Sequence, residues 1–103
     1  MVAENDHRRI VGFLLADCVK ACGHIITVDV LRGYRGRGLG RKLMLRCHQR
    51  LRQLNARVIR LETAVSNRRA RSLYQSLGYT CLERARRYYA DGQDAWVMEK
   101  KLE

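Results

Sequence analysis

The sequence contains no proline, one phenylalanine and one tryptophan, and it has 10 acidic residues against 21 basic ones. The absence of proline excludes a collagen-like or proline-rich disordered chain. No apolar run approaches the roughly 18 residues of a membrane span, and residues 1–9 lack the apolar core of a secretion signal. We therefore expect a soluble cytoplasmic protein that does not act at a membrane.

What is present suits one small packed domain. The chain has 103 residues, of which 47% are hydrophobic. A domain of this size buries roughly two-thirds of the surface that its unfolded chain exposes. The net charge of +11 is compatible with nucleic acid, a ribosomal surface or a polyphosphate ligand, and it does not choose among them. Many of the arginines are also expected simply to solvate helix faces.

The cysteines do not indicate a metal site or a disulfide framework. Without a secretion signal, Cys18, Cys22, Cys47 and Cys81 are expected to be reduced. His24 follows the first pair closely, but no second close pair completes a tetrahedral site. We expect no bound metal.

The first third of the chain predicts a hairpin. Residues 1–9 form a polar lead-in, either frayed or the tail of a strand. Residues 10–16 and 24–31 are short apolar, partly β-branched runs of strand length, separated by a plausible turn over 17–23. The two strands should pair within 10–31.

The middle of the chain predicts a β-α-β unit over residues 35–63. A helix of about four turns is indicated by apolar residues that recur every three to four positions, with Asn55 as its terminator. Residues 58–63 then form a strand parallel to the one before the helix. The apolar positions of this helix are Leu39, Leu43, Cys47, Leu51 and Leu54.

The last third predicts a second helix and a strand pair. Ser66 or Asn67 caps a helix over 66–78, and Gly78 stands where a C-terminal glycine belongs. Within 79–102, two strands are joined around Asp91-Gly92.

A glycine-rich stretch opens the first helix and has the features of a phosphate cradle. Alternate glycines leave no side chain between the backbone and a ligand, so successive N–H groups can turn toward an anion. The helix start adds unpaired donors and the positive end of a dipole. The stretch contains Gly36, Gly38 and Gly40, with Arg35, Arg37 and Arg41 around them.

Spacing removes two of the interpretations of this loop. A Walker loop needs Lys and then Ser or Thr directly after its second glycine, but Leu39 follows Gly38 and no Ser or Thr directly follows Lys42. A dinucleotide fingerprint needs G-x-G-x-x-G directly after the strand and an acidic residue about 20 positions further on. Here Gly36, Gly38 and Gly40 are spaced 2 and 2, and no acidic residue follows them before Glu62. A glycine-rich turn without a ligand remains as one alternative.

The other interpretation is that the loop binds a cofactor, as it does in a superfamily that this sequence resembles. Arg35 to Gly40 fits R/Q-x-x-G-x-G/A, which resembles the acetyl-CoA pyrophosphate loop of the GNAT acyltransferases. The downstream order of Leu61-Glu62, Ser66-Asn67, Leu73-Tyr74 and Leu77-Gly78-Tyr79 resembles the same signature. The resemblance covers about residues 10–102. It implies an α/β fold (α+β in some schemes) with a mixed central sheet, and acetyl-CoA as the acyl donor.

Within that superfamily the tail is most similar to the N-terminal protein acetyltransferases of the RimI and NatA catalytic-subunit group. The segment Arg87-Tyr88-Tyr89-Ala90-Asp91-Gly92 carries this similarity. The resemblance implies acetyl transfer to the N-terminal α-amine of a protein, with ribosomal proteins among the expected acceptors. It places Tyr88 and Tyr89 at the peptide site, against the alternative that they only pack a strand end.

The resemblance also assigns the chemistry of the site. Glu62 matches the family's proton acceptor, with an arginine ion pair as its alternative role. Tyr74 matches the tyrosine that protonates the departing CoA sulfur and also contacts the cofactor, with core packing as its alternative. Asn67 matches a cofactor contact and is also a suitable helix cap. His24 stands where some superfamily members place a second base, and a structural role is its alternative.

The remaining implied contacts are to the cofactor backbone. Val28, Asp29 and Val30 match the strand that pairs with the pantetheine arm and polarises the acetyl carbonyl, although Asp29 replaces a residue that is usually small. The pyrophosphate contacts are expected from Arg35, Gly36, Arg37, Gly38, Leu39, Gly40 and Arg41.

One departure from the family concerns the N-terminal side. Relatives usually carry a strand, two helices and a further strand before the hairpin, whereas nine residues stand there in this sequence, so the fold is expected to be N-terminally shortened. A homodimer or a partner chain would then cover the exposed sheet. Two other functions stay open: acetylation of lysine, polyamine or small-molecule amines, and an inactive CoA-binding or RNA-associated module. Nucleic acid is not expected as a substrate.

Overall fold

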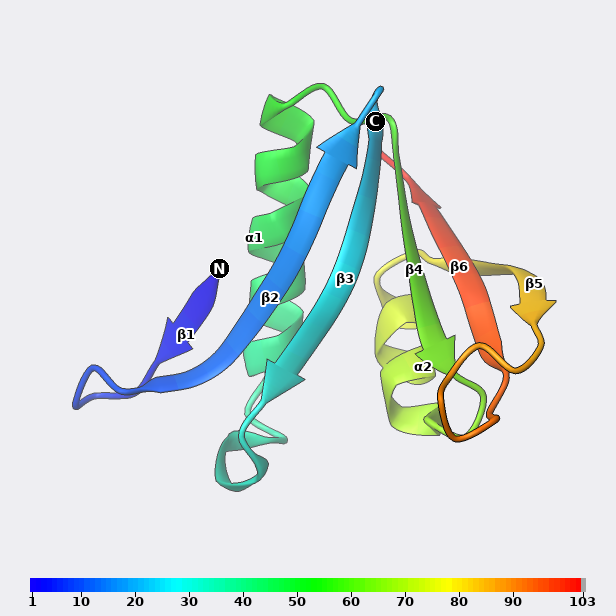
Figure 1. Cartoon of the computed structure of the whole chain (residues 1–103). Coiled ribbons are helices and arrows are strands. Elements are labelled where there is room, and N and C mark those ends of the chain that lie inside the picture. The colour runs from blue at the N-terminus through cyan, green and yellow to red at the C-terminus, as the bar shows by residue number, and fades with distance from the viewer. Residues whose placement is uncertain (103) are drawn as a thin grey trace.

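The computed structural model describes residues 1–102, which form a six-stranded mixed sheet with both helices on one face (Figure 1). The strand order is β1-β2-β3-β4-β6-β5, and every neighbouring pair is antiparallel except β3 and β4. The elements are β1 (Val2–Glu4), β2 (Ile10–Val19), β3 (Cys22–Val30), α1 (Leu39–Gln53), β4 (Val58–Ala64), α2 (Arg68–Ser76), β5 (Thr80–Ala85) and β6 (Ala95–Lys101), with a 3-10 turn η1 (Arg32–Tyr34) before α1.

The predicted lead-in over residues 1–9 contains a strand of its own. Val2 lies opposite Phe13 and Ala3 opposite Gly12, so β1 adds to the edge of the hairpin. The connecting turn is closed by the Asn5 side chain, whose Oδ1 accepts hydrogen bonds from the N–H groups of His7 and Arg9. An Asx turn of this kind supplies locally the backbone bonds that a short polar segment otherwise lacks.

The predicted turn over residues 17–23 was too long. β2 and β3 continue until only Lys20 and Ala21 connect them, and both adopt positive φ values of 50° and 64°. Such tight turns normally contain asparagine or glycine, which tolerate this conformation. The sequence therefore carried no local signal for the turn.

The two helices bury their apolar sides against the same face of the sheet. Leu43, Met44, Cys47 and Leu51 of α1 are buried, and Tyr74 of α2 joins the same cluster. Asn55 has a φ of 64° directly after α1, and Gly78 has a φ of 96° after α2, so both helices end in left-handed residues. Along residues 1–102 no helix is long and apolar enough to cross a bilayer.

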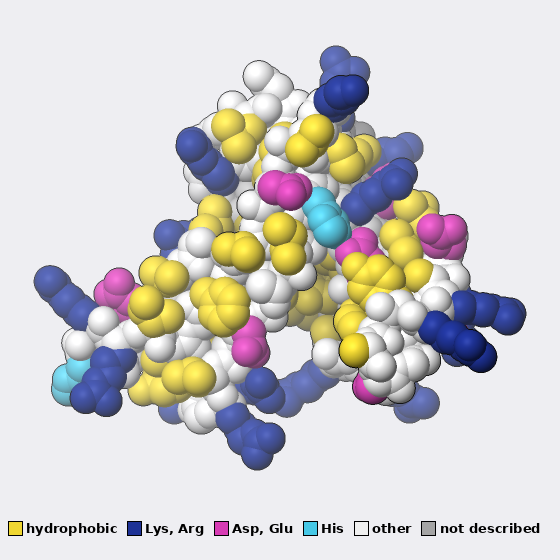
Figure 2. Space-filling model, in the orientation of Figure 1, with side chains coloured by type: hydrophobic (Ala, Val, Ile, Leu, Met, Phe, Trp, Pro, Cys, Tyr) yellow, Lys and Arg dark blue, Asp and Glu magenta, His cyan; other side chains and the backbone are white. Residues whose placement is uncertain are grey.

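The opposite face of the sheet, which we call the outer face, is uncovered. Its side chains alternate along β2 with those that face α1, and Phe13, Leu15, Val19 and Ile26 are between 41% and 63% exposed. In Figure 2 hydrophobic side chains gather over β2 and β3 on this side. The homodimer expected from the sequence would cover such a surface, and it stays a prediction.

Candidate active site

The central feature is a fork between the two parallel strands. β3 and β4 pair only from Cys22 opposite Val58 to Ile25 opposite Leu61. Ile26 is an extra residue in β3, because Ala16 lies opposite Ile25 and Leu15 opposite Thr27. A bulge of this kind bends its strand and terminates pairing, and β3 and β4 diverge toward their C-terminal ends (Figure 1).

A cleft of about 530 Å³ opens below the fork on the helix side. Its volume lies within the range of roughly 300–1,000 Å³ that small-molecule sites occupy. One wall is the end of β3, whose backbone no longer has β4 beside it, and the others are the glycine loop and α2. The lining residues are Val28, Asp29, Val30, Tyr34, Arg35, Gly36, Gly38, Leu39, Gly40, Arg41, Asn67, Arg69, Ala70, Leu73 and Tyr74.

The glycine loop gives the cleft an open helix N-terminus. Gly36 and Gly38 have φ values of 80° and 76°, which favour glycine, and Gly38 is the residue that precedes the first turn of α1. Within the described chain no side chain caps this helix start, and Lys42 N–H is the donor to Gly38 O. The preceding N–H groups of the first turn therefore face the cleft as free donors. This arrangement is suited to a phosphate group.

Arginine side chains surround this helix start. The Arg35 Nε donates to Val30 O at 2.9 Å, and its Nη2 lies 3.5 Å from Asp29 Oδ1, so Arg35 is held against the end of β3. Arg41 donates to Ser76 Oγ of α2 at 3.0 Å. These contacts fix two positive charges beside the loop.

Of the residues predicted to contact the cofactor, Asp29 lines the cleft and Arg37 does not. The Asp29 carboxylate accepts from Val30 N–H at 2.9 Å and neutralises part of the Arg35 charge, which accounts for an acid at that position. Arg37 does not line the cleft; its guanidinium lies 4.9 Å from the centroid of the Tyr34 ring. Because a cation gains from the face of an aromatic ring, Arg37 orders the loop from outside.

Four lining residues were not among the predicted site residues: Tyr34, Arg69, Ala70 and Leu73. Tyr34 precedes the motif, and its hydroxyl accepts a hydrogen bond from Asn5 Nδ2 at 2.9 Å. Leu73 lies 3.7 Å from where a Cβ of Gly40 would stand, and Arg69 Nη2 lies 4.0 Å from that position of Gly36. Arg69, Ala70 and Leu73 reach the cleft because α2 packs beside the loop, and no local pattern indicated that packing.

Asn67 and Tyr74 lie on the α2 wall. Asn67 caps α2, with its Oδ1 accepting from Ala70 N–H at 3.1 Å, so the capping role is present and the side chain also reaches the cleft. Tyr74 is 7% exposed and packs edge-on against Tyr79 at 5.9 Å. Burial, and then the neighbouring Tyr89 phenol, raise the pKa of Tyr74 above its ordinary value. Its hydroxyl therefore keeps its proton near neutral pH.

Glu62 lies at the point of the fork. It directly follows Leu61, the last residue of β4 paired with β3, and it shares the outer face with its β6 partner Val97. Its Oε1 lies 2.7 Å from His24 Nε2 and accepts from the Tyr88 hydroxyl at 3.0 Å. The partner of Glu62 is therefore His24 and not the arginine proposed as an alternative.

The paired tyrosines cover this carboxylate. The Tyr88 and Tyr89 rings meet edge-to-face at 5.0 Å. Burial and the hydrogen bond to Glu62 raise the pKa of Tyr88, and burial and the Glu62 charge raise that of Tyr89. Tyr88 is therefore the tyrosine of this pair that contacts the carboxylate.

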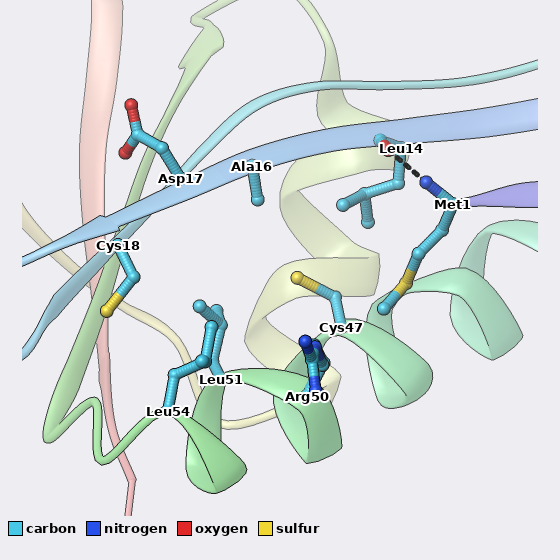
Figure 3. A pocket seen from close by; sticks show the side chains of 9 residues that line it. All are labelled: Met1, Leu14, Ala16, Asp17, Cys18, Cys47, Arg50, Leu51 and Leu54. Atoms are coloured by element: carbon cyan, nitrogen blue, oxygen red, sulfur yellow. Dashed lines mark hydrogen bonds between the residues drawn. The ribbon is translucent and has the colours of Figure 1, made fainter.

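A second, smaller cavity of about 250 Å³ lies between β2 and α1. Cys18, Cys47 and Leu51 point into it, whereas the Asp17 carboxylate points away (Figure 3). None of the predicted site residues lines it. The fork is therefore the candidate active site.

Comparison with known proteins agrees with this geometry. The model of the acetyltransferase (GNAT) family matches residues 1–79. The N-terminal acetyltransferase A complex catalytic subunit NAA10 of Arabidopsis thaliana is 40% identical over 107 residues, which covers 98% of this chain and 56% of that protein. An N-alpha-acetyltransferase of Sulfurisphaera tokodaii is 38% identical over 81 residues, covering 78% of this chain and 48% of its own length.

A solved structure has the same architecture. The ribosomal-protein-S18-alanine N-acetyltransferase of Escherichia coli superposes with a TM-score of 0.86 at 28% identity, covering 95% of this chain and 64% of that one. The chain thus spans about half to two-thirds of the length of the relatives it matches. The predicted mixed-sheet fold with a β-α-β unit is confirmed.

Proposed function

Because the chain belongs to the acetyltransferase (GNAT) family, we propose that it transfers an acetyl group from acetyl-CoA to the N-terminal α-amine of a protein. The observation that carries the proposal is the fork. It places a phosphate-binding cleft on the helix side and the hydrogen-bonded set of His24, Glu62 and Tyr88 on the outer face. An acyl donor and an acceptor amine can therefore approach the same gap from opposite sides.

The cleft suits the diphosphate end and the pantetheine arm of acetyl-CoA. The uncapped start of α1, with Arg35 and Arg41 beside it, would hold the diphosphate. The backbone of Val28, which has no β4 partner, would hold the arm and direct its N–H group at the carbonyl oxygen. Acetyl-CoA supplies the activated acetyl group as a thioester.

The proton chemistry belongs to residues at the gap. A peptide α-amine has an unperturbed pKa of about 7.7 to 8.0, so a modest base suffices to remove its proton. Glu62 accepts that proton, and His24 orients the carboxylate. When the carbon–nitrogen bond has formed and the carbon–sulfur bond breaks, the Tyr74 hydroxyl donates its proton to the sulfur.

The side chains around Glu62 on the outer face favour the end of a peptide chain as the acceptor. Tyr88 is 50% exposed beside Glu62 and offers an aromatic surface to an extended segment. The names of the Arabidopsis, Sulfurisphaera and Escherichia coli relatives support an α-amine as the group acetylated, and the last supports a ribosomal protein as one acceptor. The cytoplasmic location expected from the sequence belongs to the same proposal.

The test uses acetyl-CoA with three acceptors, and mass spectrometry reads the product. The acceptors are peptides with a free N-terminus, the same peptides with a blocked N-terminus and a free lysine, and spermidine. The proposal requires that only the first set gains an acetyl group. Acetylation of lysine or spermidine instead would support the other amine acceptors, and calorimetric binding of CoA without any product would leave only a CoA-binding module.

A further inference from the structure

Helix α1 carries an unusual distribution of charge. It contains five lysine and arginine side chains and no acidic residue. Lys42, Arg46 and Arg50 are exposed and follow one another at four-residue intervals, so they lie on one face, about 6 Å apart along the axis. We call these three residues the α1 basic face. Like charges at this spacing oppose helix formation.

The molecule does not neutralise this face. The ion pairs formed by arginines among residues 1–102 involve Arg35, Arg60 and Arg84, and none involves α1. Arg46 donates to Val2 O at 3.1 Å and Arg50 to Gln53 Oε1 at 3.3 Å, and both acceptors are uncharged. The sequence from 30 to 61 contains no acid that would interleave with these cations.

A ligand of the cleft would reach only the start of this face, where Lys42 follows the lining residue Arg41. The cleft reaches α1 only through Leu39, Gly40 and Arg41. Arg50 lies about 14 Å further along the helix, given 1.5 Å per residue. That separation exceeds the Debye length of about 8 Å at physiological salt, so phosphates in the cleft are largely screened from it. We therefore expect the α1 basic face to bind an anion other than the phosphates held in the cleft.

The surroundings of the face favour nucleic acid over a membrane. A membrane-surface helix inserts its apolar side into the lipid, but Leu43, Met44 and Leu51 of α1 are buried under the sheet. Arginine guanidinium groups match phosphate geometry closely. Because α1 has no aromatic side chain to stack on unpaired bases, its contacts would be to the backbone of a helix.

We propose that the α1 basic face docks on the phosphate backbone of double-helical RNA. Duplex RNA is recognised chiefly by shape and by phosphate and 2′-hydroxyl contacts, which an arginine-rich helix without base-reading aromatics supplies. Arg46 and Arg50 lie further along α1 than the cleft-lining residues, so RNA held by them would leave the fork open to its substrates. The binding is expected to be independent of base sequence and strongly weakened by salt.

The experiment measures fluorescence anisotropy of a labelled RNA hairpin titrated with the full chain at several salt concentrations. A variant with Lys42→Gln, Arg46→Gln and Arg50→Gln should lose at least roughly tenfold in affinity, and the slope of log K against log salt should fall by on the order of 2 to 3. The double variant Lys42→Gln, Arg50→Gln keeps Arg46 and its hydrogen bond to Val2. It should show a smaller loss of affinity and a smaller fall in the salt slope than the triple variant. Circular dichroism establishes that each variant is folded.

A matched control removes the same charge elsewhere. Arg8→Gln, Lys20→Gln and Arg86→Gln change three exposed cations outside α1, and this variant should retain the hairpin affinity. Equal losses in both triple variants would show that only net charge acts, and would overturn the proposal. Tighter binding to a poly-glutamate peptide, to a DNA hairpin of the same sequence or to vesicles with anionic phospholipid would overturn it as well. Because the readout is binding, its failure leaves the acetyl-transfer assay unaffected.

Discussion

His24 Nε2 and Glu62 Oε1 lie 2.7 Å apart at the fork, although the two residues are 38 positions apart in the sequence. β3 supplies the first and β4 the second, and they come together where the pairing of these parallel strands ends. The bond gives the carboxylate a fixed orientation toward the gap. It also makes His24 the side chain that can position Glu62, the proposed proton acceptor.

Replacement of Glu62 tests the proton acceptor. Glu62→Gln keeps the size of the side chain and removes the base, so kcat for peptide acetylation should fall by at least about 100-fold while acetyl-CoA affinity is retained. The matched control is Glu99→Gln, because the Glu99 side chain is equally exposed at 16% but pairs with Arg60. Stopped assays with a saturating peptide measure the rates. Equal rates in the two variants would remove the assigned role from Glu62.

A double-mutant cycle tests the positioning role of His24. If His24 acts through Glu62, His24→Gln lowers kcat in the wild-type background but has little further effect in Glu62→Gln. The kcat and KM of all four proteins should be measured over a range of pH, since a structural role would change stability without changing the pH profile. Additive losses would show that the two residues act independently.

Tyr74 is tested against a neighbouring buried tyrosine. Tyr74→Phe keeps the packing against Tyr79 and removes the hydroxyl at the cleft, so kcat should fall by roughly 100-fold with the protein still folded. Tyr79→Phe removes the partner of His48, which should lower the free energy of unfolding by about 1 kcal/mol without lowering kcat. A Tyr74→Phe enzyme with normal kcat would leave that residue only a packing role.

The glycine loop is tested through its left-handed residues. Gly38→Ala puts alanine at a φ of 76°, and the control Gly92→Ala puts it at a φ of 86°. At both positions no atom lies within 4 Å of the new Cβ. Each substitution should cost about 1–2 kcal/mol of stability from backbone strain alone. Only Gly38→Ala should also weaken CoA binding, which calorimetry measures. Equal CoA affinities would contradict the assignment of the loop as the phosphate site.

Buried His48 makes stability depend on pH. Burial, followed by the nearby Lys100 and Arg52 charges, lowers the pKa of His48 from 6.5 to about 4. Because the unfolded chain binds this proton first, the stability from neutral His48 is complete above about pH 6.5 and is lost as the pH falls toward about 4.

Urea unfolding measures the size of that effect. Between about pH 7.5 and about pH 5, His48 should account for a loss on the order of 2 kcal/mol in the free energy of unfolding. His48→Gln should show a flatter dependence, whereas His7→Gln, in the exposed turn after β1, should behave like the wild type. If the free energy of unfolding of His48→Gln depended on pH as strongly as that of the wild type, the dependence would come from other groups.

Local sequence patterns determined the periodic and glycine-dependent parts of the protein. The recurrence of Leu43, Cys47 and Leu51 marked α1, and the spacing of Gly36 and Gly38 marked the open helix start. Both features depend on neighbours within a few positions, so a pattern suffices. The turn at Lys20 and Ala21 was predicted too long, over 17–23, because those residue types do not favour positive φ and so did not mark its two central residues.

Only the tertiary structure decided which distant residues meet. The bulge at Ile26 ends the pairing of β3 and β4 and thereby opens the cleft, and nothing in the order of residues measures where two strands part. The bond of Glu62 to His24, the turning of Arg37 onto Tyr34 and the entry of Arg69 and Leu73 into the cleft follow from that packing. Such contacts depend on how separate helices and strands pack against one another. A sequence pattern specifies residue types and spacings along the chain, but not the distances between residues in the folded protein.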